Sequence, residues 1–228
     1  MNINNQGKTV LVTGANRGIG LAFCKYFKDL GYIVYALCRK SSDELEQVAN
    51  TIIEDVDISD AKDCDLLFKK LAGVKIDLLI NNAGILLNEV LGQIDFDSIR
   101  KQFEVNTLGA LRISEGLINN NNFNEPAKIA IITSRMGSIE DNSSGGRYGY
   151  RMSKAALNAA AKSLSIDLKP KGIAVGIYHP GFVATDMVGG VGDISPKTAA
   201  KRIAALIDKL DISNSGTFWH SNGEILPW

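Results

Sequence analysis

Short apolar runs alternate along this chain with longer segments that have helical periodicity. The apolar runs are rich in β-branched residues, and they are Thr9–Thr13, Tyr32–Leu37, Ile76–Ile80, Lys128–Thr133 and Ile173–Tyr178, with weaker ones at Thr51–Val56 and Gly216–Trp219. The helical segments are Leu21–Leu30, Ala61–Leu71, Phe96–Ile118, Tyr150–Leu168 and Pro196–Leu210. Strands that alternate with helices form parallel sheets with crossover helices on both faces. The alternation therefore predicts an α/β fold, a doubly wound parallel sheet of about six to seven strands.

The same pattern runs through the whole chain, so we expect one domain over residues 1–228. No internal repeat or Pro/Gly-rich linker divides it. The 25 basic and 25 acidic residues cancel, and no basic stripe matches a row of phosphates, which favours a small-molecule partner over a nucleic acid. The first apolar run is far too short for a signal sequence or a membrane span. We therefore expect a cytoplasmic protein without a membrane partner.

The three cysteines, Cys24, Cys38 and Cys64, lack C-x-x-C spacing and lie in apolar or helical stretches. Small buried thiols fit such places well, so we interpret all three as core residues. We expect no metal site.

A glycine-rich turn follows the first predicted strand directly and precedes an amphipathic helix. Its residues are Gly14, Ala15, Asn16, Arg17, Gly18, Ile19 and Gly20. Glycines permit a tight turn and close approach of the backbone, and a helix N-terminus offers free N–H groups to a pyrophosphate. Glycine also serves plain strand-to-helix turns. The position between a strand and a helix nevertheless favours a dinucleotide site.

A tyrosine and a lysine four residues apart, Tyr150 and Lys154, open a long predicted helix. That spacing places both side chains on one helix face. A phenol with a pKa of about 10 keeps its proton at neutral pH, but a nearby ammonium group favours the phenolate and lowers the pKa. Such pairs also arise by chance on amphipathic helices. If the pair is functional, Tyr150 is an acid for reduction and a base for oxidation.

Two serines follow the fifth apolar run. Ser134 stands at the carboxyl end of the predicted strand, where a hydroxyl can hold a carbonyl oxygen against Tyr150. Ser138 lies four residues further on, where ordinary turn chemistry is expected of a serine. We rank Ser134 ahead of Ser138. A further polar residue, Asn106, stands inside a predicted helix, where a buried asparagine needs partners.

Together these motifs resemble the short-chain dehydrogenase/reductase family. The glycine spacing is G-x-x-x-G-x-G, and Asn81-Asn82-Ala83-Gly84 follows the fourth predicted strand. Tyr150 and Lys154 follow Ser134 in the family's order. The stretch from Tyr150 to Asn158 and the closing Gly223–Trp228 are similar to the C-factor and Sniffer-like carbonyl reductase group. The resemblance implies a Rossmann-like fold and transfer of a hydride between a nicotinamide cofactor and a carbonyl or alcohol carbon.

The resemblance also implies roles for individual residues. Ser134, Tyr150, Lys154 and Asn106 would form the catalytic set, with Asn106 supporting a water that connects to Lys154. Lys154 would in addition hold the nicotinamide ribose hydroxyls. The remaining cofactor-binding residues are Asn82, Ala83 and Gly84 beside the ribose and nicotinamide, Asp57 and Ile58 around the adenine, and Pro180, Gly181, Val183 and Thr185 near the carboxamide and phosphates.

The residues after the second predicted strand bear on which nicotinamide cofactor binds. An NAD site usually places an acidic residue there, whereas an NADP site needs cations for the 2′-phosphate. Here Cys38 stands in place of the acid, Arg39 follows it, and Arg17 lies in the glycine turn. Guanidinium groups suit phosphate contacts, although Arg39 and Lys40 could simply be solvated at a strand end. We therefore predict NADPH rather than NADH.

Two other functions compete with a carbonyl reductase. Sugar-nucleotide epimerases share the tyrosine and lysine, but they resemble a G-x-x-G-x-x-G turn and usually carry a larger substrate domain. A nucleotide-sensing or signalling protein of the C-factor type would keep the fold without strong catalysis. The long helices Phe96–Ile118 and Tyr150–Leu168 resemble those that pair between family subunits, so we expect a homodimer or homotetramer.

Overall fold

The structure, a computed structural model, describes residues 7–228, and its seven strands form one parallel sheet in the order β3-β2-β1-β4-β5-β6-β7. The strands are β1 (Thr9–Thr13), β2 (Ile33–Leu37), β3 (Thr51–Ile53), β4 (Ile76–Asn81), β5 (Phe123–Ile132), β6 (Ile173–His179) and β7 (Phe218–His220). The direction of winding reverses between β1 and β4, and ligands of such sheets bind at the carboxyl ends of the strands near this point. The predicted doubly wound sheet is confirmed.

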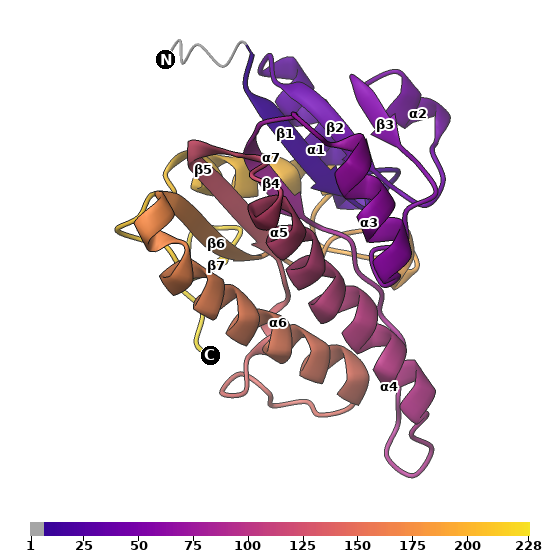
Figure 1. The fold of residues 1–228 in the computed structure, drawn as a ribbon. Coiled ribbons are helices and arrows are strands. Elements are labelled where there is room, and N and C mark those ends of the chain that lie inside the picture. Colours follow the sequence, from indigo (N-terminus) through magenta and orange to yellow (C-terminus); the bar gives the residue numbers. More distant parts are fainter. Residues whose placement is uncertain (1–6) are drawn as a thin grey trace.

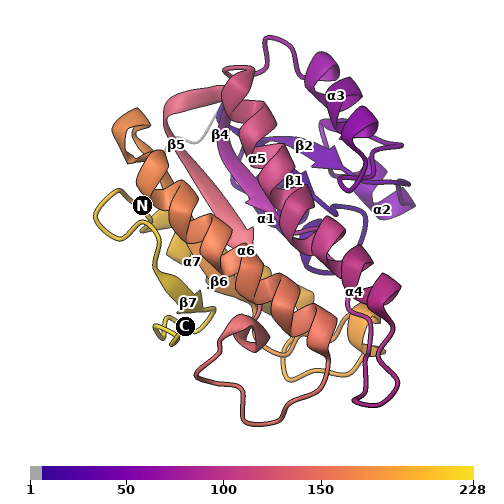
Figure 2. The same ribbon diagram turned by 60° about the horizontal axis from the view of Figure 1, so that its bottom comes forward.

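Helices cover both faces of the sheet (Figures 1 and 2). They are α1 (Gly18–Asp29), α2 (Asp43–Glu46), α3 (Ala61–Lys70), α4 (Phe96–Phe103), α5 (Ala110–Asn119), α6 (Tyr148–Asp167) and α7 (Pro196–Asp208). Helices α3, α5 and α6 lie on one face, and α1 and α7 pack together on the other. Side-chain caps begin several of them: the Asp60 carboxylate accepts from two N–H groups of α3, and the Ser195 hydroxyl accepts from Thr198 N in α7.

Several element boundaries differ from the sequence prediction, and three of the differences bear on the central strands and the site. The segment expected as one helix over Phe96–Ile118 contains a π-helical stretch, η1 (Glu104–Gly109), between α4 and α5. Strand β5 begins at Phe123 rather than Lys128. Helix α6 begins at Tyr148, so Tyr150 lies within its first turn.

Two apolar layers, one on each side of the sheet, make up the core. One joins the sheet to α3, α5 and α6, and the other joins it to α1 and α7. Cys24, Cys38 and Cys64 are buried and free, as expected from the sequence. No helix within residues 7–228 is long and apolar enough to cross a membrane.

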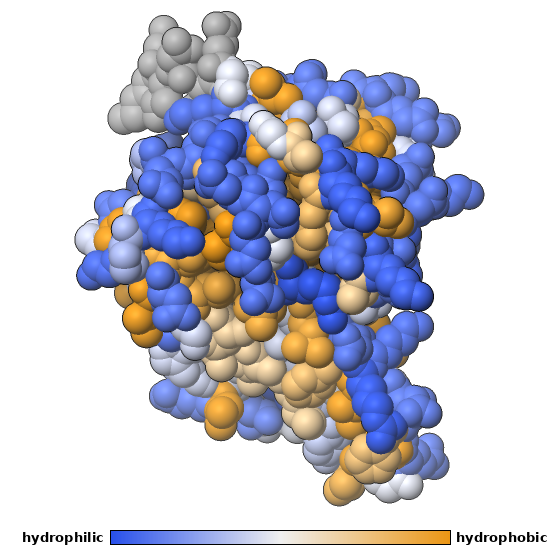
Figure 3. Space-filling model, viewed as in Figure 1, coloured by the Kyte–Doolittle hydropathy of each residue, from blue (hydrophilic) through white to orange (hydrophobic). Residues whose placement is uncertain are grey.

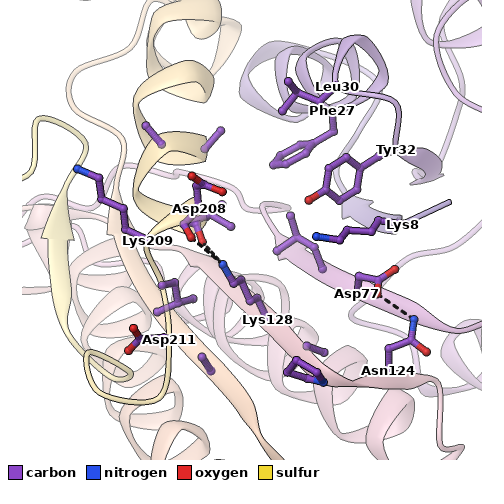
Figure 4. A pocket seen from close by; sticks show the side chains of 18 of the residues that line it. Lys8, Phe27, Leu30, Tyr32, Asp77, Asn124, Lys128, Asp208, Lys209 and Asp211 are labelled. Carbon is purple, nitrogen blue, oxygen red and sulfur yellow. Dashed lines mark hydrogen bonds between the residues drawn. The ribbon is translucent and has the colours of Figure 1, made fainter. Parts of the chain in front are cut away.

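A cavity of about 1070 Å³ lies at the amino ends of the strands (Figure 4). Two of its charged groups, Lys128 and Asp77, are engaged in the fold. Lys128 Nζ donates to the carbonyl oxygens of Ile207 (2.7 Å) and Asp208 (3.0 Å) at the end of α7. Asp77 accepts from Thr9 N and from Asn124 Nδ2. This cavity lies at the opposite end of the sheet from the predicted site residues.

Candidate active site

Three elements bring the predicted catalytic side chains together at the carboxyl end of the sheet. Ser134 follows β5, Tyr150 and Lys154 lie on α6, and Asn106 lies in η1. Figure 2 shows the loop after β5 and the start of α6 side by side at this end. All four residues are buried, with exposed fractions of 7%, 8%, 4% and 0% for Ser134, Tyr150, Lys154 and Asn106. The sequence therefore identified a set of residues that the fold places in one region.

Lys154 is held by the backbone of the central sheet. Its Nζ donates to the carbonyl oxygen of Ile132 at 3.1 Å and lies 5.9 Å from the centroid of the Tyr150 ring. Burial lowers the pKa of Lys154 to about 8, because removal from water disfavours the charged form. An ammonium group with this pKa can exchange protons close to neutral pH.

Tyr150 differs from the sequence expectation of a lowered pKa. Burial raises the pKa of its phenol above the usual value, while a hydrogen bond with Ser134 and the charge of Arg147 act in the opposite direction. Desolvation of the buried phenol exceeds those two effects. The groups that act to lower the pKa of Tyr150 are therefore Ser134 and Arg147. The sequence spacing pointed only to Lys154.

The Asn106 side chain is hydrogen-bonded to two residues from different parts of the chain, Ile85 and Ser153. Its Oδ1 accepts from Ile85 N at 2.8 Å, and its Nδ2 donates to Ile85 O at 2.9 Å and to Ser153 Oγ at 3.0 Å. The Ser153 hydroxyl in turn donates to Tyr150 O. A Cβ on Gly84 would stand 3.1 Å from Asn106 Oδ1 and 3.6 Å from Lys154 Nζ. Asn106 therefore links the segment after β4 to the helix that carries Tyr150 and Lys154.

The structure separates the two candidate serines. Ser134 Oγ accepts from Met136 N at 3.1 Å and lies beside Tyr150. Ser138 Oγ instead donates to Trp228 O at 2.9 Å and accepts from Asp141 N at 3.1 Å. Ser138 thus ties the loop after β5 to residue 228, which agrees with ordinary turn chemistry, and Ser134 is the serine at the site.

The glycine turn packs so closely that side chains would not fit. A Cβ on Gly14 would lie 2.9 Å from Ala83 Cα, and one on Gly20 would lie 2.1 Å from Gly14 O. Gly14 and Gly18 both have positive φ, and a Cβ on Gly18 would meet Thr185 Cγ2 at 3.4 Å. The turn is therefore a backbone-lined cradle at the start of α1, which is the kind of surface that approaches a pyrophosphate.

Asn82 supports the glycine turn through hydrogen bonds of its side chain and backbone. Its Nδ2 donates to the carbonyl oxygens of Thr13 (3.0 Å) and Gly14 (3.2 Å), and its backbone N–H donates to Thr13 Oγ1. Ala83 N also donates to Thr13 Oγ1. The side chain of Asn82 is thus used to position the glycine turn.

The predicted phosphate-binding arginines both lie on the surface. Arg39 is exposed, and its positive charge helps to lower the pKa of Asp57. Arg17 pairs with Asp186 at 3.3 Å across the opening between the glycine turn and the segment after β6. Ser42 Oγ donates to Asn16 O at 2.8 Å, so the loop after β2 lies against the glycine turn. Cys38 cannot replace a ribose-binding acid, because burial raises the pKa of its thiol to about 11.

Asp57 and Ile58 face different surroundings. Burial raises the pKa of Asp57, but the hydroxyl and amide of Ser59 together with nearby positive charges outweigh that effect and lower it. The Ile58 side chain is buried, and a Cβ on Gly109 would meet it at 2.7 Å. The Ile58 side chain is thus part of the core, and its backbone oxygen accepts from Arg112 Nη1 at 2.7 Å.

The segment after β6 is fixed by its neighbours. Pro180 O accepts from Ser221 Oγ at 2.9 Å, and Gly181 has φ 93° with a Cβ position only 3.3 Å from Ile194. Val183 is buried and bridges to Ile194, while Thr185 lies beside Gly18. The segment after β6 therefore lies next to the glycine turn. This position agrees with the cofactor-binding role that the resemblance implies for both.

Sequence reasoning missed Glu89, a buried acid that borders the site. Its carboxylate accepts from Ser98 Oγ (2.6 Å), Gln102 Nε2 (2.6 Å) and Gly149 N (3.0 Å), and its backbone oxygen accepts from Arg147 N. A single acid among the apolar residues of 85–91 was the available signal. Its partners lie on α4 and α6, so only the fold could reveal them.

A doubly wound sheet with a serine, a tyrosine and a lysine buried at its carboxyl end is the architecture of a class of oxidoreductases. The model of the short chain dehydrogenases matches residues 8–194, and the chain belongs to this family.

Individual relatives agree with that assignment. The chain is 39% identical over 226 residues to 1-hydroxy-2-glutathionyl-2-methyl-3-butene dehydrogenase of Rhodococcus sp. (strain AD45), covering 96% of this chain and 99% of the relative. It is 40% identical over 154 residues to the C-signal protein of Myxococcus xanthus, covering 67% and 93%. The NADPH-bound carbonyl reductase from chicken fatty liver superposes with a TM-score of 0.84 at 27% identity, covering 98% and 100%. The predicted family resemblance is confirmed.

Proposed function

We propose that the chain is an NADPH-dependent reductase of aldehydes or ketones that also oxidises the corresponding alcohols. The observation that carries this proposal is the buried set of Ser134, Tyr150, Lys154 and Asn106 at the carboxyl end of the sheet. The glycine turn and the segment after β6 together form the cradle that fits a dinucleotide. The Rhodococcus relative is named as a dehydrogenase of a hydroxy compound, which supports activity on an alcohol carbon.

The residues divide the work of the reaction. When bound, NADPH supplies a hydride for the carbonyl carbon. Ser134 donates a hydrogen bond to the carbonyl oxygen and orients it. Tyr150 gives its phenolic proton to the same oxygen as the alcohol forms, and it takes that proton back in alcohol oxidation. Lys154, with its lowered pKa, returns a proton to Tyr150, and Asn106 fixes the backbone behind them.

The preference for NADPH rests on charge. Arg17 and Arg39 are exposed beside the glycine turn, and no carboxylate stands at position 38. Arg39 and the hydroxyl of Ser41 come from one short loop, which the Ser42 hydroxyl ties to Asn16 O. Guanidinium groups and hydroxyls are suitable donors to a 2′-phosphate. The NADPH-bound carbonyl reductase from chicken liver supports the same choice.

A weakly catalytic signalling protein is the second candidate function. The similarity to the C-signal protein favours it, although that match covers only 67% of this chain. The intact catalytic set favours the enzyme instead.

Replacement of Tyr150 by Phe tests the enzyme proposal. Steady-state oxidation of NADPH with a panel of aldehydes, ketones and quinones should lose at least about 100-fold in kcat/KM, since general acid catalysis contributes this much. NADPH binding, followed by fluorescence titration, should be unchanged. Tyr148→Phe is the matched control, because Tyr148 lies two residues earlier in the same helix and has Met152, not a lysine, four residues later. Its kcat/KM should stay within about twofold of the wild type. Retained turnover in Tyr150→Phe contradicts the mechanism, and no turnover by the wild type favours signalling.

A further inference from the structure

Three arginines near the entrance of the site differ in what their guanidinium groups bind. Arg135 is paired with Asp141. Arg151 donates to Gly145 O (3.3 Å), Met136 O (3.5 Å) and Ser144 Oγ (2.8 Å), so it holds the loop between β5 and α6 together. Arg147 is exposed, and within residues 7–228 it takes part in no ion pair. Its charge is thus available to a ligand.

The free guanidinium of Arg147 lies beside the groups that act on the substrate. Its Nη1 is 3.9 Å from Met136 Sδ, and Met136 N donates to Ser134 Oγ. Arg147 precedes Tyr150 by three residues, and its positive charge acts to lower the pKa of the Tyr150 phenol. A positive charge therefore borders the place where Ser134 and Tyr150 hold the reacting oxygen.

The backbone at Arg147 is strained and held in place. Arg147 has φ 51° and ψ 47°, the left-handed region that favours glycine, and Gly145 and Gly146 before it also have φ 63°. Arg147 N donates to Glu89 O at 3.1 Å, and the Glu89 carboxylate fixes Gly149 N. A third glycine would relieve the strain at this position. The chain instead carries a long cation there on a rigid support.

We propose that Arg147 binds a carboxylate group of the substrate, so that the preferred substrates are carbonyl or alcohol compounds that carry an acidic group. A guanidinium group forms strong, oriented hydrogen bonds with a carboxylate. This inference rests on the proposed function, because it concerns the substrate of the same site.

The test compares 4-carboxybenzaldehyde with its methyl ester, which differ in one negative charge. The wild type should reduce the acid with at least about tenfold higher kcat/KM than the ester. Arg147→Met should remove that preference, and its loss of kcat/KM on the ester, which arises through the pKa of Tyr150, should be smaller than its loss on the acid. Arg147→Lys should retain part of it. Arg147→Gly should lose the preference without a lower Tm, since it relieves the left-handed strain. Arg100→Met, an exposed arginine on α4, is the control and should behave as the wild type.

A binding measurement separates this inference from the proposed function. Calorimetric titration of both aldehydes into the enzyme with NADP+ reports recognition without turnover. Preferential binding of the acid that Arg147→Met abolishes supports the inference even if no reduction occurs, and that absence of reduction contradicts only the proposed function. Equal binding and equal kcat/KM for acid and ester in the wild type overturn the inference while leaving the reductase proposal standing. Equal losses on both compounds in Arg147→Met also overturn it, because they mean that Arg147 acts only on the acidity of Tyr150.

Discussion

At the scale of single residues, the site depends on where each charge is held. Lys154 donates to a backbone carbonyl and not to a carboxylate, so burial controls its pKa and lowers it to about 8. Tyr150 is enclosed, and its pKa is raised by burial. Desolvation favours the neutral form of each group and so moves their two pKa values apart. Transfer of a proton from the Lys154 ammonium group to a Tyr150 phenolate is therefore favourable.

The cofactor preference is decided by individual side chains, and Arg39→Asp tests it. The change should raise the KM for NADPH by about 10- to 100-fold, because it removes a charge-assisted contact and adds repulsion toward a 2′-phosphate. The KM for NADH, which lacks that phosphate, should change far less. Steady-state kinetics with both cofactors measures this. Lys169→Asp, at the amino end of β6, should leave both values unchanged, and an equal rise of both KM values in Arg39→Asp would falsify the preference.

At the scale of elements, the sequence alone predicts the structure correctly where local patterns decide it. The strands of the sheet and the order of the motifs follow from apolar runs and glycines, and Ser134, Tyr150 and Lys154 could be placed from their spacing. The π-helical stretch η1 could not, because nothing in the local sequence specifies it. Asn106 stabilises it through bonds to Ile85 and Ser153, which are distant in sequence. The positions of Glu89 and Arg147 likewise depend on contacts between α4 and α6.

The start of α6 is an element whose stability depends on Glu89. Glu89→Gln keeps the shape but replaces one acceptor oxygen by an NH2 group, which then faces a donor from Ser98, Gln102 or Gly149. We expect a loss of about 1–3 kcal/mol in the free energy of unfolding, as for a buried unsatisfied donor. We also expect a lower kcat, since α6 carries Tyr150. Urea denaturation and steady-state kinetics measure the two effects.

The control for Glu89 is Glu115→Gln on the exposed side of α5. It makes the same chemical change at a solvated position and should alter the free energy of unfolding by less than about 0.5 kcal/mol. If Glu89→Gln is as mild as Glu115→Gln, the buried carboxylate does not hold the start of α6.

At the scale of the whole molecule, the face formed by α6 is less polar than its surroundings. Figure 3 shows apolar and weakly apolar residues gathered at the lower centre of this face, where α6 runs in Figure 1. Met152 (49% exposed) and Ile166 (62% exposed) lie on it, with the exposed Ala159 midway between them. Their spacing of seven residues places the three along one side of the helix. We propose that this stripe is the surface through which subunits pair.

Ala159→Glu tests the pairing of subunits through α6. In a two-fold interface the same patch faces its own copy, so a charge in the middle of the stripe meets a like charge or loses its hydration. Light scattering after gel filtration should give a multiple of 24.6 kDa for the wild type and the monomer mass for Ala159→Glu. Ala72→Glu, an equal change at an exposed position outside α6, should keep the wild-type mass. A monomeric wild type, or an unchanged mass in Ala159→Glu, contradicts assembly through this face, because the stripe would then be an ordinary solvent-exposed helix surface.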